Sequence, residues 1–156
     1  MFIQNYLMQN MENLVNNYPK EAIQQSGKIK ICVCQENGRK HILYNQSNVF
    51  LTKIKVDGAL IQSGERCDYA VDAEAKDIFL IELKGSDISH ACNQVLTTFY
   101  YFINNYQSER WHARIIVSKV RAPNLISNAE KRLQKLQKER SDFDYVIRTG
   151  DFRESI

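Results

Sequence analysis

Apolar and polar positions along the chain alternate in ways that predict both helices and strands. Apolar residues recur at helical spacing over residues 2–16, from 87 to about 106, and from about 127 to 140. Short apolar runs bounded by turn residues predict strands, and Asn37-Gly38 predicts a tight turn inside a hairpin over residues 28–45. A polar stretch at 19–25 predicts a short turn that ends at Ser26-Gly27. The predicted strands are residues 29–34, 41–44, 49–56, 66–73, 78–84, 114–120 and 144–148.

This order of elements favours a mixed α/β domain with helices packed on a sheet. The length of 156 residues suits a single domain. We expect an N-terminal helix within residues 1–26, a core over about 28–120, and a C-terminal helix and strand within 124–150. The sequence has no run of eighteen apolar residues and no basic, cleavable leader pattern, so we expect a cytoplasmic protein without a membrane partner.

Composition narrows the chemistry only slightly. The net charge of +3 permits a nucleic-acid partner without arguing for one. Cys32, Cys34, Cys67 and Cys92 lie in apolar segments, which favours reduced core residues over disulfides. Cys32 and Cys34 could supply two zinc ligands, but the sequence lacks a second pair at zinc-site spacing.

Three charges interrupt the two apolar strands between residues 66 and 85: Asp68 on the first strand, and Glu82 and Lys84 on the second. Buried strands rarely keep charges without a partner or a metal ion. Two carboxylates at the end of a sheet form a hard oxygen site suited to Mg²⁺ or Mn²⁺. A lysine beside them can position an attacking water and stabilise charge on a phosphate. These are the groups that metal-assisted phosphodiester hydrolysis needs.

The hypothesis depends on hairpin register. Facing residues of an antiparallel pair have a constant index sum, and Asp68 shares a face with Glu82 only if this sum is even. An odd number of loop residues, or a bulge, gives an even sum. A three-residue loop within 74–77 meets the condition, whereas a regular four-residue loop sets Asp68 opposite Leu83, on the wrong face.

Asp68, thirteen further residues, and then Glu82-Leu83-Lys84 resemble the motif of the PD-(D/E)XK nuclease superfamily. That superfamily includes restriction endonucleases, archaeal-type Holliday-junction resolvases and RecB-like exonucleases. The resemblance covers residues 56 to 120 and implies a restriction-endonuclease-like core, with a central mixed sheet flanked by helices. Cys67 stands where the family has proline, and Thr98 stands where the RecB-like branch has tyrosine.

The resemblance also implies roles for individual residues. Asp68 and Glu82 correspond to ligands of Mg²⁺ or Mn²⁺, and the backbone carbonyl of Leu83 completes the metal ligation. Lys84 corresponds to the catalytic lysine. Gln94, on the following helix, is expected to touch a phosphate or the lysine.

Several alternatives stay open for these charged residues. Asp68 or Glu82 can instead form a buried structural ion pair with Lys84. Asp72 either extends the site as a third carboxylate or marks the exposed end of its strand. The remaining candidates are Glu74-Ala75-Lys76 as a second motif copy or as solvated surface charges, His90 as a catalytic base, and Glu12 or Glu21 as a first-helix acid or as solvated glutamates.

Basic residues dominate between residues 110 and 140. A basic strip can neutralise phosphates and provide affinity that does not depend on sequence, although a solvated helix face is the simpler alternative. Lys53 and Lys55 can add to this surface, and Trp111 and Tyr100 can stack on bases. The residues proposed to bind nucleic acid are Arg121, Lys131, Lys135 and Lys138.

The sequence therefore predicts a Mg²⁺-dependent endonuclease, a hydrolase that acts on nucleic acid, with DNA favoured. Junction resolution, restriction and anti-phage defence are the candidate roles, with a homodimer or a larger protein complex providing affinity. A catalytically inactive nuclease fold that binds nucleic acid or a partner protein is the alternative. A hydrolase of another phosphate ester is a third hypothesis.

Overall fold

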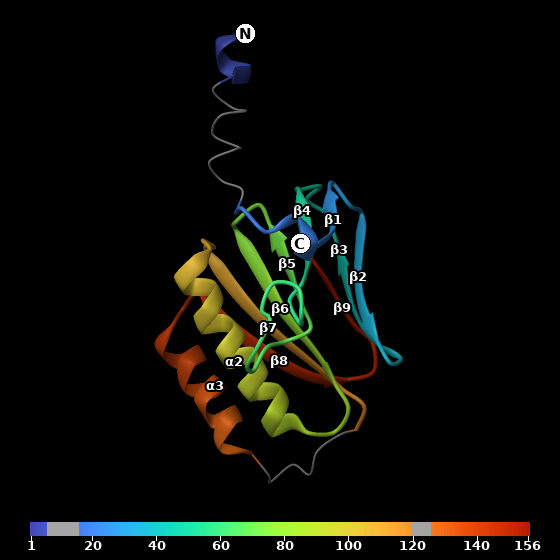
Figure 1. The fold of residues 1–156 in the computed structure, drawn as a ribbon, viewed down its shortest axis with the longest axis vertical. Coiled ribbons are helices and arrows are strands. Elements are labelled where there is room, and N and C mark those ends of the chain that lie inside the picture. Colours follow the sequence, from blue (N-terminus) through green and yellow to red (C-terminus); the bar gives the residue numbers. More distant parts are fainter. Residues whose placement is uncertain (6–15, 120–125) are drawn as a thin grey trace.

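A mixed six-stranded sheet forms the centre of the computed structural model, which describes residues 1–5, 16–119 and 126–156. Four of its strands pair antiparallel in the order β1-β4-β5-β6, and β7 and β8 extend the sheet in parallel beyond β6. The chain is therefore an α/β protein with a mixed sheet flanked by helices (Figure 1). The strands are β1 (Ile23–Gly27), β4 (Leu51–Lys55), β5 (Tyr69–Ala73), β6 (Asp77–Lys84), β7 (Arg110–Val117) and β8 (Phe143–Thr149).

A second sheet of three strands covers one face of the first (Figure 1). It consists of β2 (Ile31–Glu36), β3 (Arg39–Tyr44) and β9 (Phe152–Ser155). β2 and β3 form the expected hairpin around Asn37 and Gly38, which have φ angles of +50° and +79°. Asparagine and glycine tolerate this left-handed backbone better than other residues, so the turn prediction is confirmed.

Two helices cover the opposite face of the six-stranded sheet, α2 (Ile88–Asn105) and α3 (Asn128–Glu139). The side chain of Asp87 caps α2 by accepting from the amide of His90, and Ser127 caps α3 by accepting from the amide of Glu130. Both helix predictions are confirmed. The apolar stripe of α2 packs on the sheet through Ala91, Cys92, Val95, Leu96, Phe99 and Phe102, which are all buried.

The strand β6 is buried on both faces because it lies between the two layers. Ile78 and Leu80 face the helices, whereas Phe79 and Ile81 face the three-stranded sheet. Glu82 has the same parity as Ile78 and Leu80, so the alternation of side chains directs it toward the helix side. All four cysteines are buried thiols outside any disulfide, as expected for core residues.

Two strands were missed by the sequence pattern. The segment predicted as a short turn contains a 3₁₀ turn, η1 (Lys20–Ala22), and then β1, whose polar sequence lacks an apolar alternation. β9 was missed because it has four residues and pairs in parallel with the distant β3. β7 also begins at Arg110, four residues before its predicted start. Residues 2–5 are helical, and the rest of the predicted N-terminal helix lies mostly outside the described residues.

No helix in the described part of the chain is long and apolar enough to cross a membrane.

Candidate active site

The register of the central hairpin, β5 and β6, gives facing residues an even index sum, as the active-site prediction requires. Ala73 pairs with Asp77, which leaves a three-residue loop, and Tyr69 pairs with Ile81, so the index sum is even. Glu74 and Ala75 take φ angles of +55° and +57°, and the amide of Lys76 donates to the carbonyl of Ala73 at 3.0 Å. This is the even register that the active-site prediction required, so the condition on the register is confirmed. Asp68 lies one residue before the ladder between β5 and β6, and its amide bonds the carbonyl of Ile81 rather than that of Glu82.

Asp68 lies just before β5 and is tied to β6 through two backbone contacts. Its amide donates to the carbonyl of Ile81 at 3.1 Å, and the amide of Leu83 donates to its Oδ2 at 2.8 Å. Burial raises the pKa of Asp68 to about 6, although the hydrogen bond from Leu83 lowers it. The carboxylate is therefore fixed beside the segment that carries Glu82 and Lys84.

Glu82 is the most unusual group in the site. It is 2% exposed, and its Oε2 is buried without a hydrogen-bond partner among the described residues. Burial, and after it the Asp68 carboxylate, raise the pKa of Glu82 to about 8 against the opposing charge of Lys84. A buried carboxylate oxygen without a donor is costly, and a cation is a natural partner for it.

Lys84 ends β6 and is half-buried. Within the described ranges, no ion pair joins it to Asp68 or Glu82, so the alternative of a structural ion pair is not what the structure shows. Lys84 lies near enough to lower the pKa of Glu82 by its charge. Its ammonium group is therefore close to the Glu82 carboxylate without being bound to it.

Gln94 lies on α2 and faces the segment that leads into β5. Its Nε2 donates to the carbonyl of Arg66 at 3.0 Å, and its Oε1 is buried without a partner in the described structure. One turn later, Thr98 accepts from the amide of Cys67 at 2.8 Å and donates to the carbonyl of Gln94 at 2.7 Å. These contacts hold the residues just before Asp68 against α2. A contact between Gln94 and a phosphate stays a prediction.

Glu36 is a third carboxylate at this site that the sequence pattern did not reveal. It shares the inward face of β2 with Cys32 and Cys34, which are both buried against the central sheet. Its carboxylate adjoins Asp68 and raises the pKa of both Asp68 and Glu82. The signal in the sequence was the alternation Cys32, Cys34, Glu36, which places a charge on an otherwise buried face.

Asp72 has a structural role at the other end of the hairpin. It is 4% exposed, so it does not mark an exposed strand end. Its Oδ2 accepts from Tyr18 and Asn16 at 2.7 Å each, and its Oδ1 accepts from the amide of Ala75 at 2.8 Å. Both oxygens are therefore engaged, and Asp72 does not extend the site as a third carboxylate.

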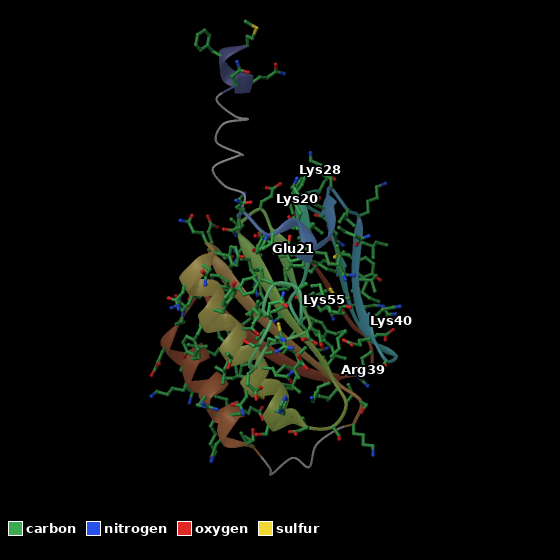
Figure 2. All side chains as sticks on the ribbon, in the orientation of Figure 1. Lys20, Glu21, Lys28, Arg39, Lys40 and Lys55 are labelled. Atoms are coloured by element: carbon green, nitrogen blue, oxygen red, sulfur yellow. The ribbon has the colours of Figure 1, made fainter. Side chains whose placement is uncertain are left out.

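The other acid and base candidates lie apart from this arrangement. Glu74 is not a solvated charge, because its Oε1 accepts from the amide of Phe50. His90 is half-exposed, and its Nε2 lies 3.6 Å from Oε2 of Glu65. Glu21 is exposed on η1, near the start of β1 (Figure 2). Glu12 lies outside the described residues.

The predicted basic strip is present in part. Lys131, Lys135 and Lys138 are all exposed on α3, whereas Arg121 lies outside the described residues. Tyr100 on α2 is 51% exposed and is available for stacking.

Three other residues do not join this surface. Trp111 is 3% exposed and packs edge-on against Phe99, so it is a core residue that cannot stack on a base. The Nζ of Lys53 donates to the carbonyl of Val33 in the three-stranded sheet, and Lys55 lies over the ring of Tyr69. These contacts direct both lysines to the side of the domain opposite α3, which corrects their expected place in the strip.

The donor atoms at the open end of the hairpin are oxygens, the ligand type that Mg²⁺ prefers. Asp68 and Glu82 offer carboxylate oxygens, and Leu83 offers a backbone carbonyl. Among the described residues, no group of three or more His, Cys, Asp or Glu side chains is arranged to hold a metal ion. Mg²⁺ commonly binds through one or two carboxylates and completes its shell with water and substrate phosphate. The unpartnered Oε2 of Glu82 is the observation that favours such a ligand.

No protein-family model, curated protein or solved structure matches the chain. Function is therefore inferred from the geometry of the hairpin and from the resemblance of its motif.

Proposed function

We propose that the chain is a Mg²⁺-dependent nuclease with a PD-(D/E)XK-type site and a restriction-endonuclease-like core. One observation supports this most strongly. The even register of β5 and β6 brings Asp68 close enough to Glu82 for its carboxylate to raise the pKa of Glu82, and the Oε2 of Glu82 is buried without a hydrogen-bond partner among the described residues. A carboxylate in that condition is expected where a cation completes the site.

Asp68 and Glu82 hold the ion in this proposal, together with the carbonyl of Leu83. When bound, a divalent cation polarises the scissile phosphate and lowers the pKa of a bound water. The hydrogen bond from the amide of Leu83 fixes the orientation of Asp68 before substrate arrives. The protein therefore supplies a preorganised pair of ligands and a largely buried setting in which charges interact strongly.

Lys84 supplies the positive charge that the phosphate needs. It is not paired with either carboxylate in the described structure, so its ammonium is available to stabilise the negative charge that develops on the phosphate oxygens. Gln94 supports the site from α2, because its hydrogen bond to the carbonyl of Arg66 holds the backbone just before Asp68 in place.

Nucleic acid, with DNA favoured, is the proposed substrate. The exposed lysines of α3 and the exposed ring of Tyr100 offer phosphate contacts and a stacking surface on neighbouring helices. Junction resolution, restriction and defence against foreign DNA remain the candidate roles, with a homodimer or a partner protein adding affinity.

A cleavage assay tests the proposal. The purified protein is incubated with single-stranded, duplex and four-way DNA and with RNA, in Mg²⁺, in Mn²⁺ or in chelator. We expect metal-dependent cleavage of at least one substrate, and a loss of about 10²-fold or more in Asp68→Ala and Lys84→Ala.

Lys76→Ala is the matched control, because Lys76 belongs to the second Glu-x-Lys copy and is exposed in the hairpin loop. It should cleave as the unmodified protein does. If no substrate is cleaved while all variants remain folded, the nuclease proposal fails, and metal-independent binding in the same samples favours a catalytically inactive binding module.

A further inference from the structure

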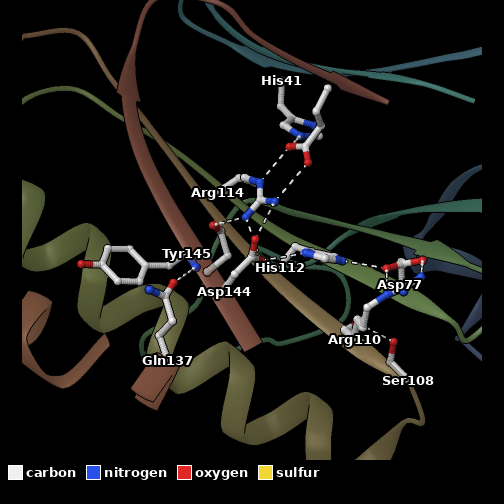
Figure 3. Close-up of polar contacts among 11 residues, drawn as sticks. His41, Asp77, Ser108, Arg110, His112, Arg114, Gln137, Asp144 and Tyr145 are labelled. Atoms are coloured by element: carbon white, nitrogen blue, oxygen red, sulfur yellow. Dashed lines mark hydrogen bonds and ion pairs between the residues drawn. The ribbon is translucent and has the colours of Figure 1, made fainter. Parts of the chain in front are cut away.

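A cluster of charged residues lies on the face of the central sheet away from α2 and α3, where the three-stranded sheet packs (Figure 3). It begins at Asp77, the first residue of β6, whereas Glu82 and Lys84 lie at the other end of that strand. The cluster is thus separate from the proposed active site. Its members are Asp77, Arg110, His112, Arg114, Asp144 and Glu154, and we call it the His112 cluster.

His112 lies between two carboxylates. Its Nδ1 is 2.7 Å from Oδ1 of Asp144, and its Nε2 is 2.7 Å from Oδ1 of Asp77. An ionised carboxylate only accepts hydrogen bonds, so both ring nitrogens must carry a proton to satisfy both contacts. Phe79 stacks on the imidazole with a centroid separation of 4.6 Å and holds its plane. The geometry therefore suits the imidazolium form.

The charges of the cluster also balance only in that form. Arg110 makes two bonds to Asp77, at 2.8 and 2.9 Å. Arg114 is 5% exposed and divides its donors between Glu154 and Asp144. Three carboxylates thus face two guanidinium groups and His112. Within these six residues, loss of the His112 proton leaves one negative charge without compensation, which is costly because His112, Asp77 and Glu154 are mostly buried.

The surrounding charges set the direction in which His112 titrates. Burial lowers its pKa, but the hydrogen bonds to Asp144 and Asp77 outweigh burial and raise it above its ordinary value. Arg114, on the same strand, opposes this rise. For Asp144, burial raises the pKa, and the bonds from His112 and Arg114 outweigh it and bring the pKa down to about 2.

One further charged group and a histidine complete the surroundings of His112. Lys76 lines the same cavity as Glu154 and His112, which has a volume of about 540 Å³. His41 of β3 bonds Glu154 through Nε2 at 2.9 Å. The His112 side chain is 18% exposed, so it can exchange protons with solvent without unfolding.

Glu154 connects the cluster to the last strand. It lies on β9, which has four residues and pairs only with β3 among the described strands. Arg114 bonds Glu154 at 2.8 and 3.1 Å and Asp144 at 3.1 and 3.3 Å. The Arg114 guanidinium therefore bonds a carboxylate on β8 and another on β9. The β8 carboxylate, Asp144, is also bonded to His112.

We propose that His112 is a pH-dependent latch that holds β9 in place, closed while its imidazole is protonated and open once it is neutral. Deprotonation turns one ring nitrogen into an acceptor that faces a carboxylate oxygen. If Asp144 loses its bond from His112, Arg114 is the remaining donor to Asp144 within the cluster. The Arg114 guanidinium then bonds Asp144 more closely, and its bonds to Glu154 weaken. Because folding raises the pKa of His112, the latch is fully closed below the unfolded pKa of about 6.5 and opens as pH rises through the folded pKa.

Hydrogen exchange of the C-terminal amides tests the latch. The amide of Ile156 donates to the carbonyl of Tyr44 at 3.0 Å and reports whether the end of β9 is seated. Its protection factor, corrected for the intrinsic pH dependence of exchange, should be lower at pH 9 than at pH 6. The protection factor at pH 6 should exceed that at pH 9 by about tenfold for each unit by which folding raises the pKa of His112. Amides in the middle of α2 serve as the internal reference.

Two further measurements decide the origin of this effect. His112→Gln should have low protection at both pH values, whereas His90→Gln, which removes a half-exposed histidine outside the cluster, should keep the pH dependence. In the unmodified protein, the imidazole nitrogens of His112 should titrate above pH 6.5 by NMR. Equal protection at both pH values, an unchanged pH dependence in His112→Gln, or a titration midpoint at or below 6.5 overturns the proposal.

Discussion

The backbone amide of Leu83 donates a 2.8 Å hydrogen bond to Oδ2 of Asp68, across the end of the central hairpin. This bond joins the two strands beside the buried Glu82, just before the half-buried Lys84 ends β6. It orients one carboxylate while the other, on Glu82, keeps a buried oxygen without a partner among the described residues. The proposed function accounts for that asymmetry, and several consequences of it and of the fold can be measured.

Replacing Glu82 by glutamine should stabilise the protein in the absence of metal. Folding raises the pKa of Glu82 from its usual 4.5 to about 8, chiefly by burial, so ionisation costs stability as pH rises through that value. The free energy of unfolding of Glu82→Gln, measured with urea, should exceed that of the unmodified protein by about 1–3 kcal/mol at pH 8. The gain should shrink at pH 4.5, and an equal gain at both pH values would contradict ionisation of Glu82 as its cause. Glu21→Gln, on the exposed surface, is the control.

Ala75→Gly should also stabilise the protein, for a local reason. Ala75 has a φ angle of +57° in the hairpin loop, a conformation that costs roughly 1 kcal/mol for a residue with a Cβ. Glycine removes this strain, partly offset by its greater freedom in the unfolded chain. Thermal unfolding should show a higher midpoint, whereas the same change in a helix, Ala129→Gly, should lower it. A lower midpoint for Ala75→Gly would show that the loop does not hold this conformation.

Tyr18→Phe should destabilise the hairpin from its loop end. The Tyr18 hydroxyl donates to Oδ2 of the buried Asp72, and this bond partly offsets the rise that burial causes in the pKa of Asp72. Removal of a hydrogen bond to a buried carboxylate should cost about 1–3 kcal/mol at pH 7. The cost should be smaller at low pH, where Asp72 is protonated. The control is Tyr100→Phe, at a half-exposed ring, which should change the free energy of unfolding by less than about 0.5 kcal/mol. Similar losses of stability in Tyr18→Phe and Tyr100→Phe would contradict a role for the bond to Asp72.

The exposed lysines of α3 should set the salt dependence of DNA binding. If Lys131, Lys135 and Lys138 each neutralise one phosphate, replacing all three by glutamine should reduce the slope of log K against log salt by up to about 3. Fluorescence anisotropy with a duplex at several salt concentrations measures this slope. Replacing Lys28 and Lys30, on the far side of the domain, should leave it unchanged. An unchanged slope in the α3 variant would remove this helix from the binding surface.

Local features of the fold could be predicted because their causes are local. The tight turn at Asn37-Gly38, the caps at Asp87 and Ser127, and the apolar stripe of α2 all depend on residues a few positions apart. The register condition on Asp68 and Glu82 was also available, because side-chain alternation and a short loop determine it.

Features that depend on distant residues could not be predicted. The polar β1 is a strand because β4 pairs with it, and β9 is a strand because it pairs with β3 more than a hundred positions earlier. Asp72 resembled an exposed strand end because its partner Tyr18 is 54 positions away in sequence. The position of Glu36 beside Asp68 likewise depends on how the three-stranded sheet packs on the central one.

The most direct test of the central claim is calorimetric titration of the purified protein with Mn²⁺, because it needs no knowledge of the substrate. We expect saturable binding to the unmodified protein and to Lys76→Ala, and a loss of at least tenfold in affinity in both Asp68→Asn and Glu82→Gln. Binding that is absent from the unmodified protein, or that survives unchanged in both variants, would contradict a metal site at the end of the hairpin.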